Sequence, residues 1–187
     1  NPRAVNSNGH IIRWKETDAN HAATEFEWDI FLFGSSADAE ADYNVSGLTA
    51  DNEFSSPDGL FIDPRGVLWL QTDDGSSGIR STTNNQMLVA IPGSVRDGEQ
   101  RTIITTDNDS ATSTVQSWVG QSAEDIQLKR FFVGPKGCEI TGIAYTPDLT
   151  NFFINIQHPT GNWPVDGEEP RSSTIVVRRD DATPIGN

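Results

Sequence analysis

Two segments of the sequence repeat the same pattern of apolar and turn residues. The first, GLFIDPRGVLWLQT, begins at Gly59, and the second, GIAYTPDLTNFFINIQ, begins at Gly142. Each has a glycine, a mostly apolar run, an Asp or Thr followed by proline, a turn and a second apolar run. Proline early in a turn between two runs of strand-forming residues is typical of a β-hairpin. The sequence therefore predicts two similar hairpins within a fold built from strands.

Short apolar runs separated by turn residues recur along the whole chain, a pattern of strands rather than helices. The predicted strands cover residues 10–15, 28–33, 60–63, 67–71, 87–91, 102–105, 129–133, 141–145, 152–156 and 173–178. Helix signals are weak, and only residues 116–126 predict a short helix. The segments 35–52 and 106–127, rich in Ser, Thr, Asp, Asn and Ala, predict long polar surface loops. The predicted fold class is all-β.

The spacing of the repeated hairpins indicates a β-propeller. Gly59 and Gly142 lie 83 residues apart, about two units of the roughly 40–50 residues that form one propeller blade. In a propeller, the innermost strand of each blade lines a central axis, and the loops at one end form the site. A chain of 187 residues supplies about four such blades at most, so we expect a partial propeller. A plain β-sandwich is the alternative.

Charge and composition exclude several classes of function. The chain has 27 Asp and Glu against 13 Lys and Arg, a formal charge of −14, and this acidity without a basic stripe argues against a nucleic-acid partner. No apolar run reaches the length of a membrane span. The single cysteine, Cys138, excludes an intrachain disulfide. The chain opens with NPRAVN, without a methionine or the regions of a signal peptide, and we interpret it as a fragment or a processed product.

Two carboxylates precede the repeated strands. Asp58 lies in SSPDGL and Glu139 in GPKGCEITG, each in a segment bent by proline and glycine. Both are expected at the mouth of a strand, where several blades converge, and calcium takes six to eight oxygen ligands. We predict that Asp58 and Glu139 bind a metal; the alternative for each is a turn residue that accepts backbone hydrogen bonds. TDDG, starting at Thr72, fits an oxygen-rich site and a plain turn equally, and His158 directly follows an apolar run.

Three cationic residues are candidates for binding a substrate phosphate. Arg130 and Lys136 flank and enter the segment FFVGPKG, and Arg3 lies in the opening NPRA. Cations at the mouth of a site bind phosphoryl oxygens, although such residues also occupy solvated strand ends. The sequence has no G-x-S-x-G nucleophile motif and no H-E-x-x-H zinc motif.

Three blocks of sequence, in this order, resemble the C-terminal region of PhoX-type alkaline phosphatases. They are NPRAVNSNGHIIRWKE, SSPDGLFIDPRGVLWLQTDD and RFFVGPKGCEITGIAYTPDLTNFFINIQHP. The resemblance extends from Asn1 to about Val177, with gaps at the two polar segments. It implies that the chain holds the C-terminal blades of a larger propeller with iron and calcium on its axis. It also implies hydrolysis of phosphate monoesters in the periplasm or outside the cell, after export by the twin-arginine route.

The resemblance carries over to individual residues. It places Asp58, in the PDG block, and Glu139, in the GxE(I/V)TG block, among the metal ligands. The iron-binding cysteine of the family lies upstream, so Cys138 is not that ligand, and most iron ligands are expected in the missing upstream blades. We therefore expect weak or no phosphatase activity from this chain alone.

One position departs from the family pattern. Some members have a basic residue that contacts substrate phosphate two positions before the PDG aspartate, and Ser56 stands there in this chain. This departure leaves a second hypothesis open, a non-enzymatic propeller that is stabilised by calcium and serves as a binding module. A propeller hydrolase that acts on lactones or phosphodiesters is a third.

Overall fold

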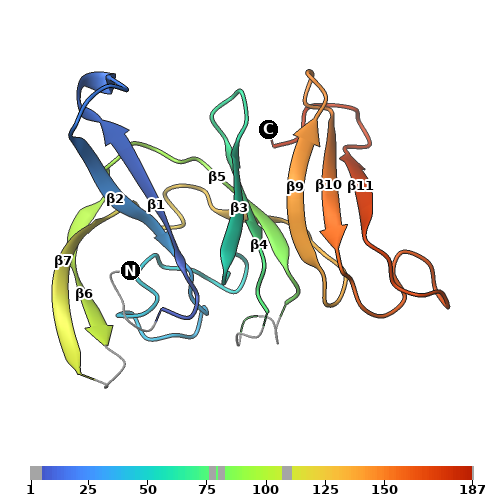
Figure 1. Cartoon of the computed structure of the whole chain (residues 1–187), viewed down its shortest axis with the longest axis horizontal. Coiled ribbons are helices and arrows are strands. Elements are labelled where there is room, and N and C mark those ends of the chain that lie inside the picture. The colour runs from blue at the N-terminus through green and yellow to red at the C-terminus, as the bar shows by residue number, and fades with distance from the viewer. Residues whose placement is uncertain (1–5, 76–78, 80–82, 107–110, 187) are drawn as a thin grey trace.

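The computed structural model describes residues 6–75, 79, 83–106 and 111–186. The described residues form eleven strands in three open sheets, which lie side by side along the long axis of the molecule (Figure 1). They include a 3₁₀ turn at Thr17–Ala19 and no α-helix. The predicted all-β class is confirmed.

The first sheet contains the N-terminal hairpin and a second hairpin from the middle of the chain. Its strand order is β1-β2-β7-β6. The strands are β1 (His10–Glu16), β2 (Phe26–Phe33), β6 (Glu99–Thr106) and β7 (Thr112–Val119). The β1–β2 and β6–β7 pairs are antiparallel, and β7 runs parallel to β2 where Val119 pairs with Ile30.

The second and third sheets are built on the two repeated segments. The second has the order β3-β4-β5-β8 and the third the order β11-β10-β9. Their strands are β3 (Pro57–Ile62), β4 (Leu68–Thr72), β5 (Gln86–Ala90), β8 (Lys129–Val133), β9 (Glu139–Tyr145), β10 (Asn151–Gln157) and β11 (Ser173–Arg178). The predicted hairpins are thus β3–β4 and β9–β10.

The central strands of the second sheet, β4 and β5, are buried on both of their faces. Leu68 and Leu70 of β4 belong to a core cluster with Phe31 of the first sheet. Trp69, between them on β4, belongs to a second cluster with Phe152 of the third sheet. Successive residues of a strand point to opposite faces, so the nearly continuous apolar run of β4 joins two hydrophobic cores.

Both repeated hairpins have an irregular register near their glycine. The shift in β3–β4 falls between Pro57 and Leu60, and in β9–β10 Gly142 has no partner and a φ of 53°. A Cβ atom on Gly59 would lie 2.6 Å from Oε1 of Gln71. The buried Gln71 side chain donates from Nε2 to the Gly142 carbonyl at 2.8 Å. Gln71 therefore ties the second sheet to the third at their two irregular positions.

The segment 106–127 differs from the predicted loop. Its residues Thr112–Val119 form β7, and turns follow to residue 127, so the short helix predicted over 116–126 is also wrong. Thr, Val and Trp favour strands, and only the C-terminal part of this otherwise exposed strand is buried, at Ser117 and Val119. The segment 35–52, by contrast, forms turns, from which Leu48 enters the first core cluster.

The 83 residues between Gly59 and Gly142 do not correspond to two successive blades, as the spacing predicted. The two hairpins lie in neighbouring sheets, with β9 in contact with β3, β4 and β5, rather than two units apart. The extra length between them comes from the β6–β7 hairpin, which leaves the second sheet and pairs with β2 of the first. Among the described residues, no helix is long and apolar enough to cross a membrane.

The turn between β3 and β4 depends on the buried carboxylate of Asp63. It accepts hydrogen bonds from the Arg65 side chain, from Nε1 of Trp69 at 3.2 Å and from the backbone N–H groups of Arg65 and Val67. Burial opposes ionisation, but these donors outweigh it and hold the pKa of Asp63 below its ordinary value. The ionised form is therefore favoured in the folded protein.

Asp63→Asn is expected to remove part of the acid dependence of stability. A lowered folded-state pKa adds stability above the unfolded pKa of about 3.9, and this stability is lost as the pH falls through the folded value. The variant should melt below the wild type at pH 7 and approach it below pH 3. Thermal melts at both pH values measure this, and an equal difference at both would contradict it.

Candidate metal centre

Three ligand-bearing side chains meet where β4 and β10 end and β9 begins. These strand ends lie at the lower edge of the second and third sheets in Figure 1. One ligand atom each of Asp73, Glu139 and His158 lies within 4.8 Å of the others. Asp73 directly follows β4, Glu139 opens β9 and His158 directly follows β10. Because β4 and β10 end where their partner strands β3 and β9 begin, segments far apart in the sequence reach this edge together.

The electrostatics of the cluster disfavour its negative charge. Glu139 is 8% exposed. Burial raises the pKa of Glu139, repulsion by Asp73 and Asp58 raises it further, and the hydrogen bond to His158 offsets part of this increase. Nε2 of His158 lies 3.3 Å from Oε2 of Glu139. Across the described ranges, no Lys or Arg forms an ion pair with Asp58, Asp73 or Glu139, and Glu139 faces His158. A bound cation would neutralise the negative charge of this group.

The backbone at this edge is in sparsely populated conformations. Ser56 has a φ of 51° and His158 a φ of 35°, both in the left-handed region that non-glycine residues rarely adopt. The Asp73 N–H donates to the Ser56 carbonyl at 3.0 Å, which joins the end of β4 to the start of β3. Such strain concentrates at functional sites, where the surrounding structure maintains it.

The loop after His158 is fixed to the loop before Glu139. The backbone N–H and the hydroxyl of Thr160 both donate to the Lys136 carbonyl, at 2.8 and 3.0 Å. Gly137 has a φ of 73°, and an added Cβ there would lie 2.4 Å from Oγ1 of Thr160. Close packing of these two loops therefore brings the imidazole to the carboxylate.

The structure places both predicted metal ligands at this edge. Glu139 is in the cluster, and Asp58, an exposed residue of β3, lies near enough to raise the Glu139 pKa. The sequence leaves Asp73 undecided between an oxygen-rich site and a plain turn, and it gives His158 no role. The available signal was position, because both residues directly follow buried strands that end at this edge. The metal-binding role of Asp58 and Glu139 stays a prediction.

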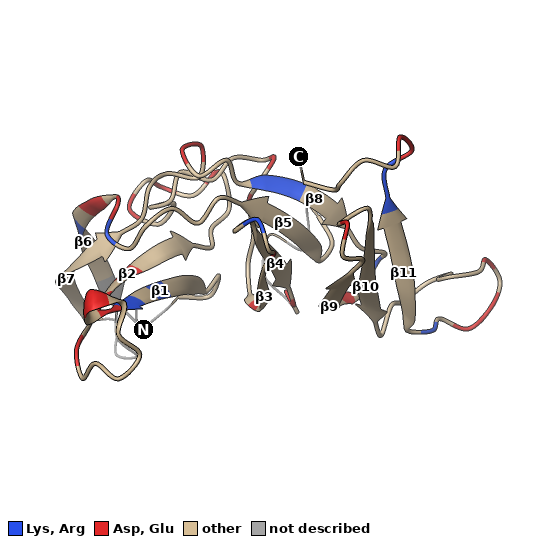
Figure 2. Cartoon of the chain, turned by 90° about the horizontal axis from the view of Figure 1, so that it is seen from above, with Lys and Arg blue, Asp and Glu red and all other residues tan. Residues whose placement is uncertain are grey.

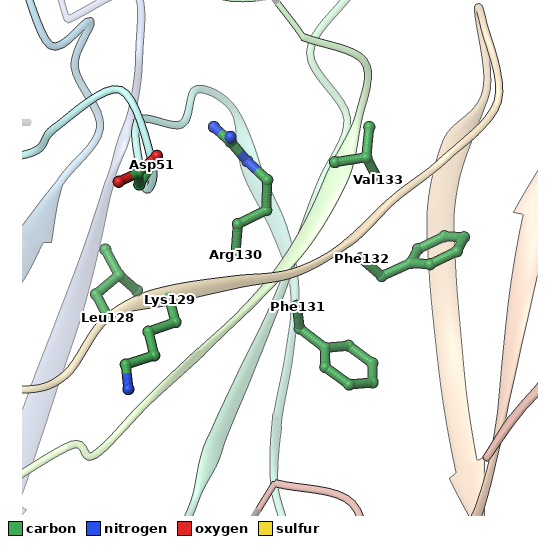
Figure 3. A pocket seen from close by; sticks show the side chains of 7 residues that line it. All are labelled: Asp51, Leu128, Lys129, Arg130, Phe131, Phe132 and Val133. Atoms are coloured by element: carbon green, nitrogen blue, oxygen red, sulfur yellow. The ribbon is translucent and has the colours of Figure 1, made fainter. Parts of the chain in front are cut away.

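The predicted phosphate-binding residue Arg130 contacts other residues than the clustered carboxylates. Arg130 is on β8, the strand farthest from β3 in its sheet (Figure 2). Its side chain points toward the loop of Asp51, opposite to Phe131 (Figure 3), and donates to Oε1 of Gln86 at 2.5 Å and to the Ala50 carbonyl at 3.2 Å.

Lys136 is exposed in the loop that leads to Glu139. In the part of the chain that the structure describes, neither Arg130 nor Lys136 pairs with the clustered carboxylates. Their phosphate-binding role stays a prediction, and Arg3 lies outside the described residues.

The donor set fits a divalent or trivalent cation. Carboxylate oxygens suit calcium, and the imidazole of His158 adds a nitrogen that suits iron. The buried Glu139, whose pKa is raised by burial and by Asp73, is a carboxylate whose ionised form a cation would stabilise. Asp58, Asp73, Glu139 and His158 are therefore the residues that would hold a metal in this chain.

Comparison with known proteins shows the family of the chain. The sequence model of the family "Alkaline phosphatase PhoX" matches residues 1–160. Among solved structures, the chain is similar to Pseudomonas fluorescens PhoX in complex with vanadate, a transition state analogue, with a TM-score of 0.71 and 31% sequence identity. That likeness covers 96% of this chain and 28% of the Pseudomonas chain. No curated protein sequence matches. The chain described here belongs to the PhoX alkaline phosphatase family.

Proposed function

We propose that this chain contributes a metal-binding edge to a phosphatase that hydrolyses phosphate monoesters. The observation that carries the proposal is the convergence of Asp73, Glu139 and His158 within 4.8 Å, from three separate segments. Family membership supports the reaction class, and the vanadate complex of the Pseudomonas relative supports phosphate as the bound group. We propose calcium as the ion at the carboxylates and iron as a second ion, with most of its ligands outside this chain.

The residues of the chain have separate roles in this proposal. Asp58, Asp73 and Glu139 would hold the cation, and His158 would hold it or orient Glu139. A metal held in this way polarises phosphoryl oxygens and stabilises the charge that develops on them in the transition state. In a chain of charge −14, a substrate dianion would otherwise meet repulsion at this edge. Lys136, in the adjacent loop, is proposed to assist with the anion.

The arrangement of the sheets supports a propeller assembly. The innermost strands of the proposed blades would be β1, β3 and β9, and the metal edge would face the axis. Because the chain spans 28% of the Pseudomonas chain, we propose that the remaining blades and ligands come from further sequence of the same protein. A periplasmic or extracellular location is proposed on the family resemblance.

One observation favours a second candidate function. Ser56 occupies the position where some family members have a phosphate-contacting basic residue, and Arg130 is engaged with Gln86 and Ala50 instead. A binding module stabilised by calcium would need the carboxylates without a cationic partner for phosphate. This alternative predicts calcium binding without phosphate binding.

Asp73→Asn is expected to weaken calcium binding at least about tenfold, because ligand charge sets calcium affinity over several orders of magnitude. Isothermal titration of chelator-treated protein measures the affinity, with the exposed Asp166→Asn as a control of equal charge change. Titration of the calcium-loaded chain with vanadate then separates the two functions. Vanadate binding that Asp73→Asn loses supports the phosphatase; calcium binding alone supports the module; and an unchanged calcium affinity in Asp73→Asn contradicts both.

A further inference from the structure

Asn85 is a buried amide between the segments that carry the two best-placed carboxylates. It directly precedes β5 and is 2% exposed. Its side chain lies between the end of β4 and the loop that leads into β9, as its hydrogen bonds establish. It belongs to none of the motifs that the sequence analysis identified, and its side chain is not a member of the ligand cluster.

The amide oxygen of Asn85 fixes the residues on both sides of Asp73. Oδ1 accepts from the Asp74 N–H at 2.6 Å and from the Thr72 hydroxyl at 2.9 Å. The Thr72 hydroxyl in turn accepts from the Gln86 N–H at 3.0 Å, so the contact is anchored to β5. Thr72 and Asp74, the neighbours of Asp73, are thereby held in place. This restricts the direction of the Asp73 carboxylate.

The amide nitrogen of the same side chain fixes the residue before Glu139. Nδ2 donates to the Cys138 carbonyl at 2.7 Å and to the Asp74 carbonyl at 3.4 Å. The backbone of Asn85 also accepts from the Gly134 N–H at 2.8 Å, at the start of the loop that leads to Glu139. One planar group thus joins the backbone of both carboxylate-bearing segments, which come from different sheets.

We propose that Asn85 is a positioning residue for the metal centre, which sets the separation of the Asp73 and Glu139 carboxylates. This inference rests on the proposed metal-binding function. The role requires an acceptor and a donor in one rigid side chain, and the asparagine amide offers both in one plane without a change of protonation state. Residues that orient metal ligands in this way typically change metal affinity by 10–100-fold when they are replaced.

Calcium titration of the chelator-treated chain tests the inference with a matched control. Asn52 is another buried amide, which accepts from Thr49 and donates to the Leu128 carbonyl at the opposite end of β8 from Val133. Asn85→Ala and Asn52→Ala are both expected to lower the melting temperature. Only Asn85→Ala is expected to raise the calcium dissociation constant, by about 10–100-fold.

Asn85→Asp provides a second variant for the case in which Asn85→Ala does not fold. It keeps the acceptor for Thr72 and Asp74 and loses the donor to Cys138. Its added charge alone would strengthen calcium binding, so weaker binding by this variant identifies lost positioning. Unchanged or tighter binding by Asn85→Asp, or equal affinities for Asn85→Ala and Asn52→Ala, overturns the inference and leaves the metal site intact. A wild-type chain that does not bind calcium overturns the proposed metal site together with the inference.

Discussion

Glu139→Gln is expected to raise the melting temperature of the metal-free protein at pH 7 and to abolish its response to calcium. Burial, with repulsion by Asp73 and Asp58, raises the pKa of Glu139, so the ionised form is disfavoured in the folded state. A raised folded-state pKa adds stability below the unfolded pKa of about 4.3, and this stability is lost as the pH rises through the folded value. At pH 7 the wild type therefore carries a cost that a neutral amide avoids.

The expected increase is about 2–4 °C, which corresponds to ~1 kcal/mol for a chain of this size. Calcium should reverse the order of the two proteins, because it stabilises only the form that binds it. Melting scans with chelator and with calcium, at pH 7 and below pH 4, measure both effects. The metal-free wild type and variant should melt alike in acid, where Glu139 of the wild type is protonated in both the folded and the unfolded state.

Glu124→Gln makes the same chemical change at an exposed position between β7 and β8. It should leave the melting temperature unchanged, both with chelator and with calcium. A metal-free Glu139→Gln that melts below the wild type at pH 7 would show that the carboxylate stabilises the fold through its contact with His158. A calcium response that survives the substitution would remove Glu139 from the ligand set. The change in metal-free stability and the loss of the calcium response can therefore be contradicted independently.

The strands that carry the centre were predictable because their apolar runs are bounded by strong turn signals. The β3–β4 turn contains Asp63-Pro-Arg-Gly, and the two strands beside it are short and apolar. The hairpin β9–β10 repeats that arrangement. By contrast, β7 reads as a polar loop, since its first five residues are exposed and its partner β2 is distant in the sequence, with Val119 paired to Ile30. Such a contact depends on tertiary structure that local composition does not encode.

The grouping of side chains at the candidate centre was predictable only in part, for a similar reason. Asp58 and Glu139 stand out because each precedes a repeated strand. The place of His158 depends on its left-handed φ of 35°, and that of Asp73 on a hydrogen bond to the Ser56 carbonyl. Neither feature has a signature in the sequence. Local pattern locates the edge of the sheets, and backbone detail decides which side chains meet there.

Aromatic packing joins the two sheets that carry the proposed metal ligands. Trp69 of β4 is fully buried and packs edge-on against Phe152 of β10 and Phe131 of β8, with both ring centroids at 4.9 Å. Its Nε1 donates to the Asp63 carboxylate. Truncation of a buried tryptophan costs about 3–5 kcal/mol, and Trp69→Ala should lower the melting temperature by roughly 10 °C. Trp14→Ala, at a position that is 59% exposed, should change it little.

Trp69→Ala should also weaken calcium binding, because the proposed metal ligands are divided between the two sheets that Trp69 joins. Asp58 and Asp73 belong to the second sheet, and Glu139 and His158 to the third. Loss of the ring lets the two sheets shift, and the ligand atoms then leave the separation that a cation requires. Trp69→Phe, which keeps a packed ring and loses only the donor to Asp63, should retain more of both properties. Calcium titration of the three variants below their melting temperatures measures this dependence. If Trp69→Ala lost stability but kept its calcium affinity, the loop contacts of Asn85 and Thr160 would be sufficient to hold the centre without the core beneath it.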